Sequence, residues 1–391
     1  MTKVKVSKIN IDDDLYIKSE KLKINKKTIK TPIKSFDMTK LRTDTEVSSL
    51  VKGSNEIFKI FNAKDIEKYA EGSESTEKIY KDLNKHYNKT SGGEINFCFT
   101  MVKNYNSLEE KEIDILTNIA YSKSDATPLP IFEKIFSREN SAIETNYTDF
   151  IDLMQKSIDS INRLNNKPIL GIIPSSVPDA LVPYIVEFYY DNDITSFAYD
   201  FEGKTHAGLY GKLRELMISI IKLDILNESF IYSLNTQRGK VTRGTNVTKG
   251  NDILVYNFGF DIMGDNHIPQ KFPPHVAKAI KERSKSSEEN PIIRLFNTED
   301  YGHYKHDNLN SASEMYPFNE TSIPFENFES DIVAKRDMSQ RLFNSERIGF
   351  ELLKYQNLIR ESDSTVNYLK TKDQINNDLD YLQSFRKDIK L

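Results

Sequence analysis

Residues 167–203 constrain the fold most, because they have the pattern of one complete strand, helix and strand. The apolar run 169–173 is typical of a strand buried on both faces, and Pro174 ends it. Apolar residues at helical spacing follow, and then a second predicted strand over 194–199. Two parallel strands joined by a helix require a right-handed crossover, so this segment predicts a parallel α/β fold.

The rest of the chain continues the alternation of strands and helices. Residues 15–42 predict a β-hairpin that turns at Asn25, whereas 43–90 predict an irregular, partly helical insertion. Further strands are predicted over 95–102, 113–121, 229–234, 253–258 and 291–296, and helices over 147–164, 209–226 and 275–283. The number of units favours a closed (βα)8 TIM-type barrel over an open sheet. We therefore expect a basic N-terminal β segment over 1–42, a barrel with insertions over 43–330 and a C-terminal helical extension over 331–391.

Composition limits the class of protein. The single cysteine, Cys98, excludes an internal disulfide and any multi-cysteine zinc site. No apolar stretch is long enough to span a membrane, and the N-terminus lacks the pattern of a signal peptide. We therefore expect a soluble, cytoplasmic protein. The lysine-rich segment 1–42 predicts either a solvated face or one that contacts phosphates.

In a barrel of this kind the reacting groups follow the C-terminal ends of the strands. That rule selects polar residues after four predicted strands: Asp125, Asp200 with Glu202, Asn235, and Asp261 with nearby His267. A loop rich in glycine and threonine adds positive charges for phosphate contacts, at Arg238, Lys240 and Arg243. His303 and His306 stand three apart among acidic residues, which indicates either a metal site or an exposed polar loop.

Three motifs occur in an order and at spacings that resemble those of the tRNA-guanine transglycosylase family. They are DATPLP from Asp125, KPILGII from Lys167 and SFAYDFEG from Ser196. The sequence KTPI from Lys30 is also similar to the opening of that family, and SGG from Ser91 is similar to part of its DSGGF motif. The resemblance covers roughly residues 15–265.

The resemblance implies a barrel enzyme that exchanges guanine in nucleic acid for a 7-deazaguanine. In the family one Asp attacks the ribose C1′ atom and displaces guanine, while a second Asp moves protons. Asp125 matches the Asp that recognises the base, and Gly171 matches the first glycine of a base-binding segment. The chain departs from the family where Thr90 and Pro174 replace a proton-transferring Asp and a base-binding Gln. The family's zinc cysteines are absent, so a zinc-free member without a cofactor is expected.

The nucleophile is assigned by geometry, because motif pairing places Val255 at that position. Asp261 would follow a strand and Asp252 would precede it, which favours Asp261. The predicted site therefore contains Asp261 and Asp125 as catalytic residues, and a substrate-binding set of Asp125, Gly171, Asp200, Glu202, Gly203 and Asn235. The predicted partners are a nucleic acid, tRNA or DNA, and a 7-deazaguanine base, with a homodimer as one option and no membrane.

Two alternatives belong to other classes of protein. The first is a noncatalytic partner or nucleic-acid-binding subunit of the same fold. The second is an unrelated barrel enzyme that acts on a small anionic or sugar substrate, with Asp200 and Glu202 as its acid–base pair.

Overall fold

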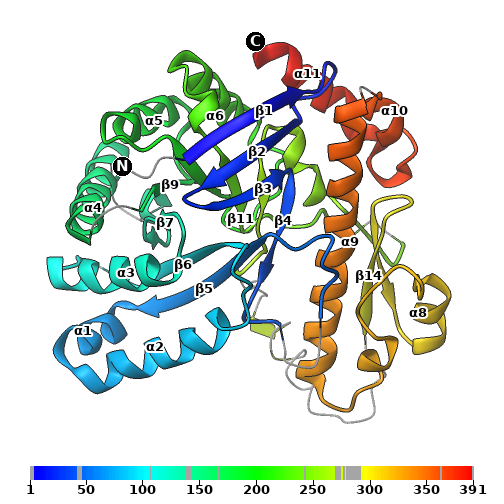
Figure 1. The fold of residues 1–391 in the computed structure, drawn as a ribbon, viewed down its shortest axis with the longest axis horizontal. Helices are drawn as coiled ribbons and strands as arrows, with labels where there is room; N and C mark the ends of the chain where they lie inside the picture. Colours follow the sequence, from blue (N-terminus) through cyan, green and yellow to red (C-terminus); the bar gives the residue numbers. More distant parts are fainter. Residues whose placement is uncertain are drawn as a thin grey trace.

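The structure is a computed structural model of the chain (Figure 1). It describes residues 4–41, 46–105, 107–137, 142–164, 167–241, 244–268, 274–275, 278, 292–361 and 363–389.

The strand–helix–strand unit predicted at 167–203 is confirmed. Strand β9 (Ile169–Pro174) leads through a short loop into helix α5 (Val182–Asp191), and β10 (Ser196–Asp200) follows. The two strands are parallel, with Ser196 opposite Leu170 and Asp200 opposite Pro174. Tyr189 of α5 fixes the helix on the strand, because its hydroxyl donates to the carbonyl oxygen of Ile172 at 2.7 Å.

This unit belongs to a large curled sheet of nine strands in the order β7-β9-β10-β11-β13-β4-β5-β6-β8, in which all neighbours are parallel. The other strands are β4 (Ile33–Asp37), β5 (Ser54–Asn62), β6 (Ile95–Lys103), β7 (Thr127–Pro128), β8 (Ile131–Phe132), β11 (Ile231–Leu234) and β13 (Ile262–Met263). The edge strands β7 and β8 are consecutive in the chain, and only Leu129 and Pro130 separate them.

The predicted insertion at 43–90 is wrong in one respect, because β5 lies inside it as a strand of the central sheet. The segment resembles a polar loop because it begins with Ser54, Asn55 and Glu56. All three are buried and hydrogen-bonded: Ser54 Oγ donates to Ser35 Oγ at 3.0 Å, and Asn55 Nδ2 donates to Asn96 Oδ1 at 3.0 Å. The helical patterns in this segment are confirmed as α1 (Ala63–Glu71) and α2 (Ser73–Tyr87).

The strand predicted at 113–121 is wrong, because this segment is helix α3 (Glu110–Lys123). Glu109 and Glu112 form a capping box at its start, and the buried residues Ile113, Leu116 and Ile119 recur at helical spacing. Helix α4 (Ile143–Leu164), which contacts α3, confirms the helix predicted at 147–164. Helix α6 (Tyr210–Lys222) confirms the helix predicted at 209–226.

Two further predicted strands need correction. Residues Ile253–Asn257 form a 3-10 turn, and the parallel strand of this region is β13, which begins after Asp261. Strand β14 (Ile293–Asn297) exists, but it belongs to a separate antiparallel sheet with β15 (Gly302–His306) and β12 (Val247–Lys249). The helix predicted at 275–283 lies outside the described residues apart from His275 and Lys278.

The N-terminal hairpin is confirmed, with Asn25 in a left-handed turn (φ 57°). Strands β1 (Val4–Ile11), β2 (Lys18–Ile24) and β3 (Lys27–Thr31) form a three-stranded antiparallel sheet. Lys18 contacts Asp261 just before β13, and Lys27 contacts Asp125 just before β7. The small sheet, drawn in blue in Figure 1, therefore lies against the amino ends of these parallel strands.

The C-terminal part is helical, as predicted. Helix α8 (Leu309–Met315) precedes the long helix α9 (Val333–Glu361), and α10 (Thr365–Leu369) and α11 (Leu379–Ile389) end the described chain. Helix α9 contacts both β4 and β14, so it joins the central sheet to the separate antiparallel sheet (Figure 1). No helix in the described part of the chain is both long and apolar enough to cross a membrane.

Candidate functional site

A cavity of about 1590 Å³ opens where the parallel strands end. Its wall includes residues that end β4, β10, β11 or β13 or lie within three residues of that end, namely Lys40, Asp200, Thr236 and Asp265. Helix α9 and strand β14 complete one side. The carboxyl ends of parallel strands are where α/β folds bind their ligands, so this cavity is the candidate site.

Asp200 ends β10 and is only 1% exposed. Its Oδ1 atom accepts hydrogen bonds from the backbone N–H of Glu202 at 2.8 Å and from Asn235 Nδ2 at 2.9 Å. Its Oδ2 atom has no partner among the described residues. Burial, together with the nearby charge of Glu202, raises the pKa of Asp200 to about 7. Asp200 can therefore hold or release a proton near neutral pH.

Asp265 follows β13, and its pKa is shifted in the opposite direction from that of Asp200. Lys34 Nζ donates to its Oδ1 atom at 2.5 Å, and Ser345 of α9 lies 3.5 Å from the same oxygen. Burial alone would raise the pKa of Asp265, but the charges of Lys34, Lys40 and His267 outweigh it and hold that pKa well below its usual value. Asp265 is therefore a carboxylate at neutral pH. None of its side-chain hydrogen bonds within the described residues involves Oδ2.

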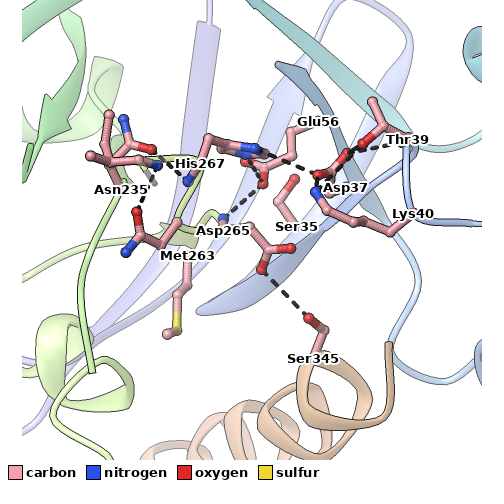
Figure 2. A network of polar contacts seen from close by, with 12 residues as sticks. Ser35, Asp37, Thr39, Lys40, Glu56, Asn235, Met263, Asp265, His267 and Ser345 are labelled. Atoms are coloured by element: carbon pink, nitrogen blue, oxygen red, sulfur yellow. Dashed lines mark hydrogen bonds and ion pairs between the residues drawn. The ribbon is translucent and has the colours of Figure 1, made fainter. Parts of the chain in front are cut away.

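Figure 2 shows His267 held between two carboxylates. His267 Nε2 lies 2.9 Å from Glu56 Oε1, and Nδ1 lies 3.5 Å from Asp37 Oδ2. The ring also stacks on Phe58, with 4.3 Å between centroids. Glu56 accepts from the backbone N–H of Asp265 at 2.7 Å. These contacts fix the segment after β13 against β4 and β5.

Asn235 connects the two acids. Its side chain donates to Asp200 and accepts from the backbone N–H of His267 at 2.9 Å, while its own N–H donates to the carbonyl of Asp265 at 3.1 Å. Asn235 has a left-handed backbone (φ 58°), a conformation that Asn tolerates better than most residues. Asn235, which the sequence predicts as a site residue, thus lies between Asp200 and Asp265.

Glu202 and Gly203 line the cavity next to Asp200. Ser175 and Ser176 each donate to a different oxygen of Glu202 at 2.8 Å, and Lys204 pairs with it at 3.2 Å. Both carboxylate oxygens are therefore occupied, which disfavours Glu202 as the base of an acid–base pair. Glu202 itself has a φ of 52°, an uncommon conformation for a residue with a long side chain, and such conformations cluster at functional sites.

Two of the three residues predicted to contact phosphates line the cavity, Arg238 and Lys240. Arg238 lies 3.7 Å from Asp252, and Asp252 in turn lies 3.3 Å from His303 Nε2. Arg243 is outside the described residues.

Asp125 and Asp261 lie at the opposite end of the strands, and neither lines the cavity. Asp125 precedes β7, where it pairs with Lys27 at 2.8 Å and accepts from the N–H of Asn96. Asp261 precedes β13, where it pairs with Lys18 at 2.9 Å and accepts from the N–H of Ile231. Neither residue follows the carboxyl end of a strand as predicted, because the segments before them are helix α3 and a 3-10 turn.

Gly171 also lies away from the cavity lining, because it faces helix α5. A Cβ atom at this position would lie 2.8 Å from the ring of Tyr189. The need for glycine here therefore arises from the close packing of helix on strand.

Within the described residues, no group of three His, Cys, Asp or Glu side chains is placed to hold a metal ion. His303 and His306 are both on β15, and burial lowers the pKa of each.

Several site residues were not predicted from the sequence: Lys34, Asp37, Lys40, Glu56 and Asp265. A strand assignment for residues 54–62 would have placed Glu56 in the sheet beside Asp37. Asp265 follows its short strand by two residues, and recognition of β13 would have identified it by the strand-end rule.

In comparisons with known proteins, no family model matches this chain, and no curated protein matches it.

Proposed function

We propose that this protein is a base-exchange glycosyltransferase that replaces guanine in tRNA or DNA by a 7-deazaguanine, on a (βα)8 barrel. The motifs that resemble the transglycosylase family support this proposal. The position of the edge strands supports the barrel, because β7 pairs with β9 and β8 pairs with β6 although two residues separate them. The segment 127–132 would then be the eighth strand and close the sheet.

The observation that carries the proposal is the pair of acidic residues, Asp200 and Asp265, which line one cavity and are both hydrogen-bonded to Asn235. Their pKa values shift in opposite directions, which agrees with two different roles. Enzymes that form a covalent intermediate at a glycosidic carbon commonly use one carboxylate as the nucleophile and another carboxyl group as an acid and base. Asp265 suits the first role because it stays ionised and has an oxygen without a hydrogen bond from the described residues. Asp200 suits the second role because its pKa is about 7.

The reaction has two balanced steps under this assignment. Asp265 attacks C1′ of the sugar, the bond from C1′ to the base nitrogen breaks, and Asp200 transfers its proton to the departing guanine. The incoming base then gives its N–H proton to Asp200 as its nitrogen bonds to C1′ and the bond to Asp265 breaks. Asn235 fixes the position of Asp200 relative to Asp265, because it hydrogen-bonds to both residues. The proposal thus moves the nucleophile from Asp261 to Asp265.

The cavity volume is compatible with an extruded nucleotide. Pockets for small molecules usually measure about 300–1,000 Å³, and the cavity of about 1590 Å³ is larger. A base in a duplex must leave its stack to reach carboxylates enclosed in this way. Arg238 and Lys240 on the wall would contact the backbone phosphates.

Incorporation of radiolabelled guanine by the purified chain, into bulk tRNA and into double-stranded DNA in parallel, tests the proposal. Label in either polymer supports base exchange and identifies the substrate. In the absence of free base, a covalent adduct with nucleic acid should survive denaturation in the parent protein and be lost in Asp265→Ala. Asp125→Asn is the matched control, and it should retain exchange because Asp125 lies at the amino ends of the strands.

Two results would contradict the proposal. An adduct that persists in Asp265→Ala rules out this nucleophile. Absence of label in both polymers, with no binding of a 7-deazaguanine, rules out base exchange and favours a binding subunit or an enzyme for small substrates.

A further inference from the structure

One wall of the cavity is formed by three arginines that come from distant parts of the chain. Arg238 follows β11, Arg294 is in β14, and Arg341 is near the start of α9. All three line the same cavity as Asp200 and Asp265. We refer to Arg238, Arg294 and Arg341 as the arginine wall.

The described residues neutralise the arginine wall only in part. Arg238 has one carboxylate nearby, Asp252 at 3.7 Å, which is a long separation for an ion pair. Arg294 Nε is buried and has no hydrogen-bond partner among the described residues. No carboxylate in the described part of the chain lies within 4.0 Å of the guanidinium of Arg341, although Asp337 is one turn away on the same helix.

The electrostatics agree with this geometry. Burial lowers the pKa of Arg238, and the charges of Arg294 and Arg341 lower it further, against the opposing effects of Asp252 and Asp265. Burial also lowers the pKa of Lys40, and the charge of Arg341 lowers it further, whereas the charge of Asp265 opposes this effect. The arginine wall therefore adjoins the carboxylate site, and it carries like charges that an anion would stabilise.

We propose that Arg238, Arg294 and Arg341 bind a phosphodiester of a nucleic acid next to the nucleotide whose sugar faces Asp265. Guanidinium groups suit this role because they bind phosphate oxygens through two parallel N–H bonds. The unpartnered and buried Oδ2 atom of Asp200 independently indicates that a ligand enters the same cavity. The identity of the phosphate carrier rests on the proposed function, whereas the arginine wall itself does not.

The proposal gives helix α9 a direct part in substrate binding. The helix belongs to the C-terminal region 331–391, which the sequence predicts as an extension of the barrel. Arg341 and Ser345 are on successive turns of α9, so the helix contributes both to the arginine wall and to the position of Asp265.

The test compares the parent protein with Arg294→Gln, Arg341→Gln and the double variant. The control is Arg360→Gln, which removes an exposed arginine of the same helix that pairs with Glu361 outside the cavity. Binding of a fluorescent single-stranded oligonucleotide is measured by anisotropy over a series of KCl concentrations. Thermal unfolding of every variant shows whether the fold is intact.

Each single variant should weaken oligonucleotide binding by about tenfold at low salt. The slope of log K against log salt should become shallower by about 0.7 for each phosphate that the variant no longer binds, whereas Arg360→Gln should match the parent protein. Equal affinities and slopes in a folded double variant would overturn the proposal.

Competition with inorganic phosphate distinguishes the source of the anion. If inorganic phosphate binds at the arginine wall and the oligonucleotide does not, the polynucleotide part of the proposal is overturned. The outcome is separate from that of the labelling experiment, because binding at the arginine wall is measured without turnover. Weaker binding in the variants together with no incorporation of guanine would refute base exchange and support the arginine wall.

Discussion

Replacement of Glu20 by Gln should change how the stability of this protein depends on pH. Glu20 is 3% exposed and lies beside Lys18 and Asp261, which are equally buried under the N-terminal sheet. Burial and the charge of Asp261 raise the pKa of Glu20 to about 8, against a smaller opposing effect of Lys18. The folded protein therefore holds a proton on Glu20 at neutral pH, and the unfolded chain does not.

The sign and size of the effect follow from this difference. The pKa is higher in the folded state than its value of 4.5 in the unfolded chain, so the stabilising contribution is complete below pH 4.5. It is lost as the pH rises towards about 8. At 1.36 kcal/mol for each pKa unit, the loss is on the order of 5 kcal/mol. Gln at this position is neutral at every pH and keeps a donor for Asp261, so Glu20→Gln should remove most of this loss.

Urea unfolding of the parent protein and of Glu20→Gln, at several pH values between 4.5 and 8, measures the effect. The control is Glu67→Gln, which changes an exposed Glu on α1. The free energy of unfolding should fall with pH more steeply in the parent and in the control than in Glu20→Gln. Parallel pH curves for the parent and Glu20→Gln would refute the reasoning, because Glu20 would then titrate alike in both states.

Three further predictions concern the site and the core. The rate of base exchange should fall as the pH rises through about 7, because Asp200 then loses the proton that it donates, and Asp200→Asn should lower the rate at least about a hundredfold, as steady-state kinetics would measure. Gly171→Ala should destabilise the fold by about 1–3 kcal/mol in urea unfolding, because its Cβ atom would lie 2.8 Å from the Tyr189 ring. Burial raises the pKa of the Cys98 thiol to about 12, so a thiol-reactive disulfide reagent should modify the native protein much more slowly than the unfolded one.

Strands and helices could be predicted from the sequence where the segment is long enough to show a pattern. The unit β9-α5-β10 was predicted because its strands are apolar, and α4 and α9 because their apolar residues recur at helical spacing. Strand β5 was missed because its first residues are polar and find their partners on neighbouring strands. Strands β7, β8 and β13 have two residues each, which is too short for any periodic signal.

The positions of the predicted site residues depend on which strands the sequence identifies. Asp200 is the last residue of a correctly predicted strand, and Glu202 and Asn235 follow two such strands. All three line the cavity or contact its lining residues. Asp125 and Asp261 were selected from segments that are not strands, so the strand-end rule placed them at the wrong end. The contacts that lower the pKa of Asp265 come from β4 and the loop after it, at a large separation in sequence that no local pattern reveals.

The short segment 127–132 pairs with strands on both sides, so cleavage within it would affect the whole central sheet. It hydrogen-bonds to β9 through the N–H of Leu129, at 3.0 Å from the carbonyl of Leu170, and the N–H of Glu133 just after it reaches Val102 of β6 at 3.0 Å. Proteolysis within this segment would break its pairing with both β9 and β6, and it would leave the backbone N–H and C=O groups along these two strands unpaired. Such rows of unpaired groups are templates for pairing with other chains, so a nick at this place should lead to aggregation rather than to a stable two-fragment complex.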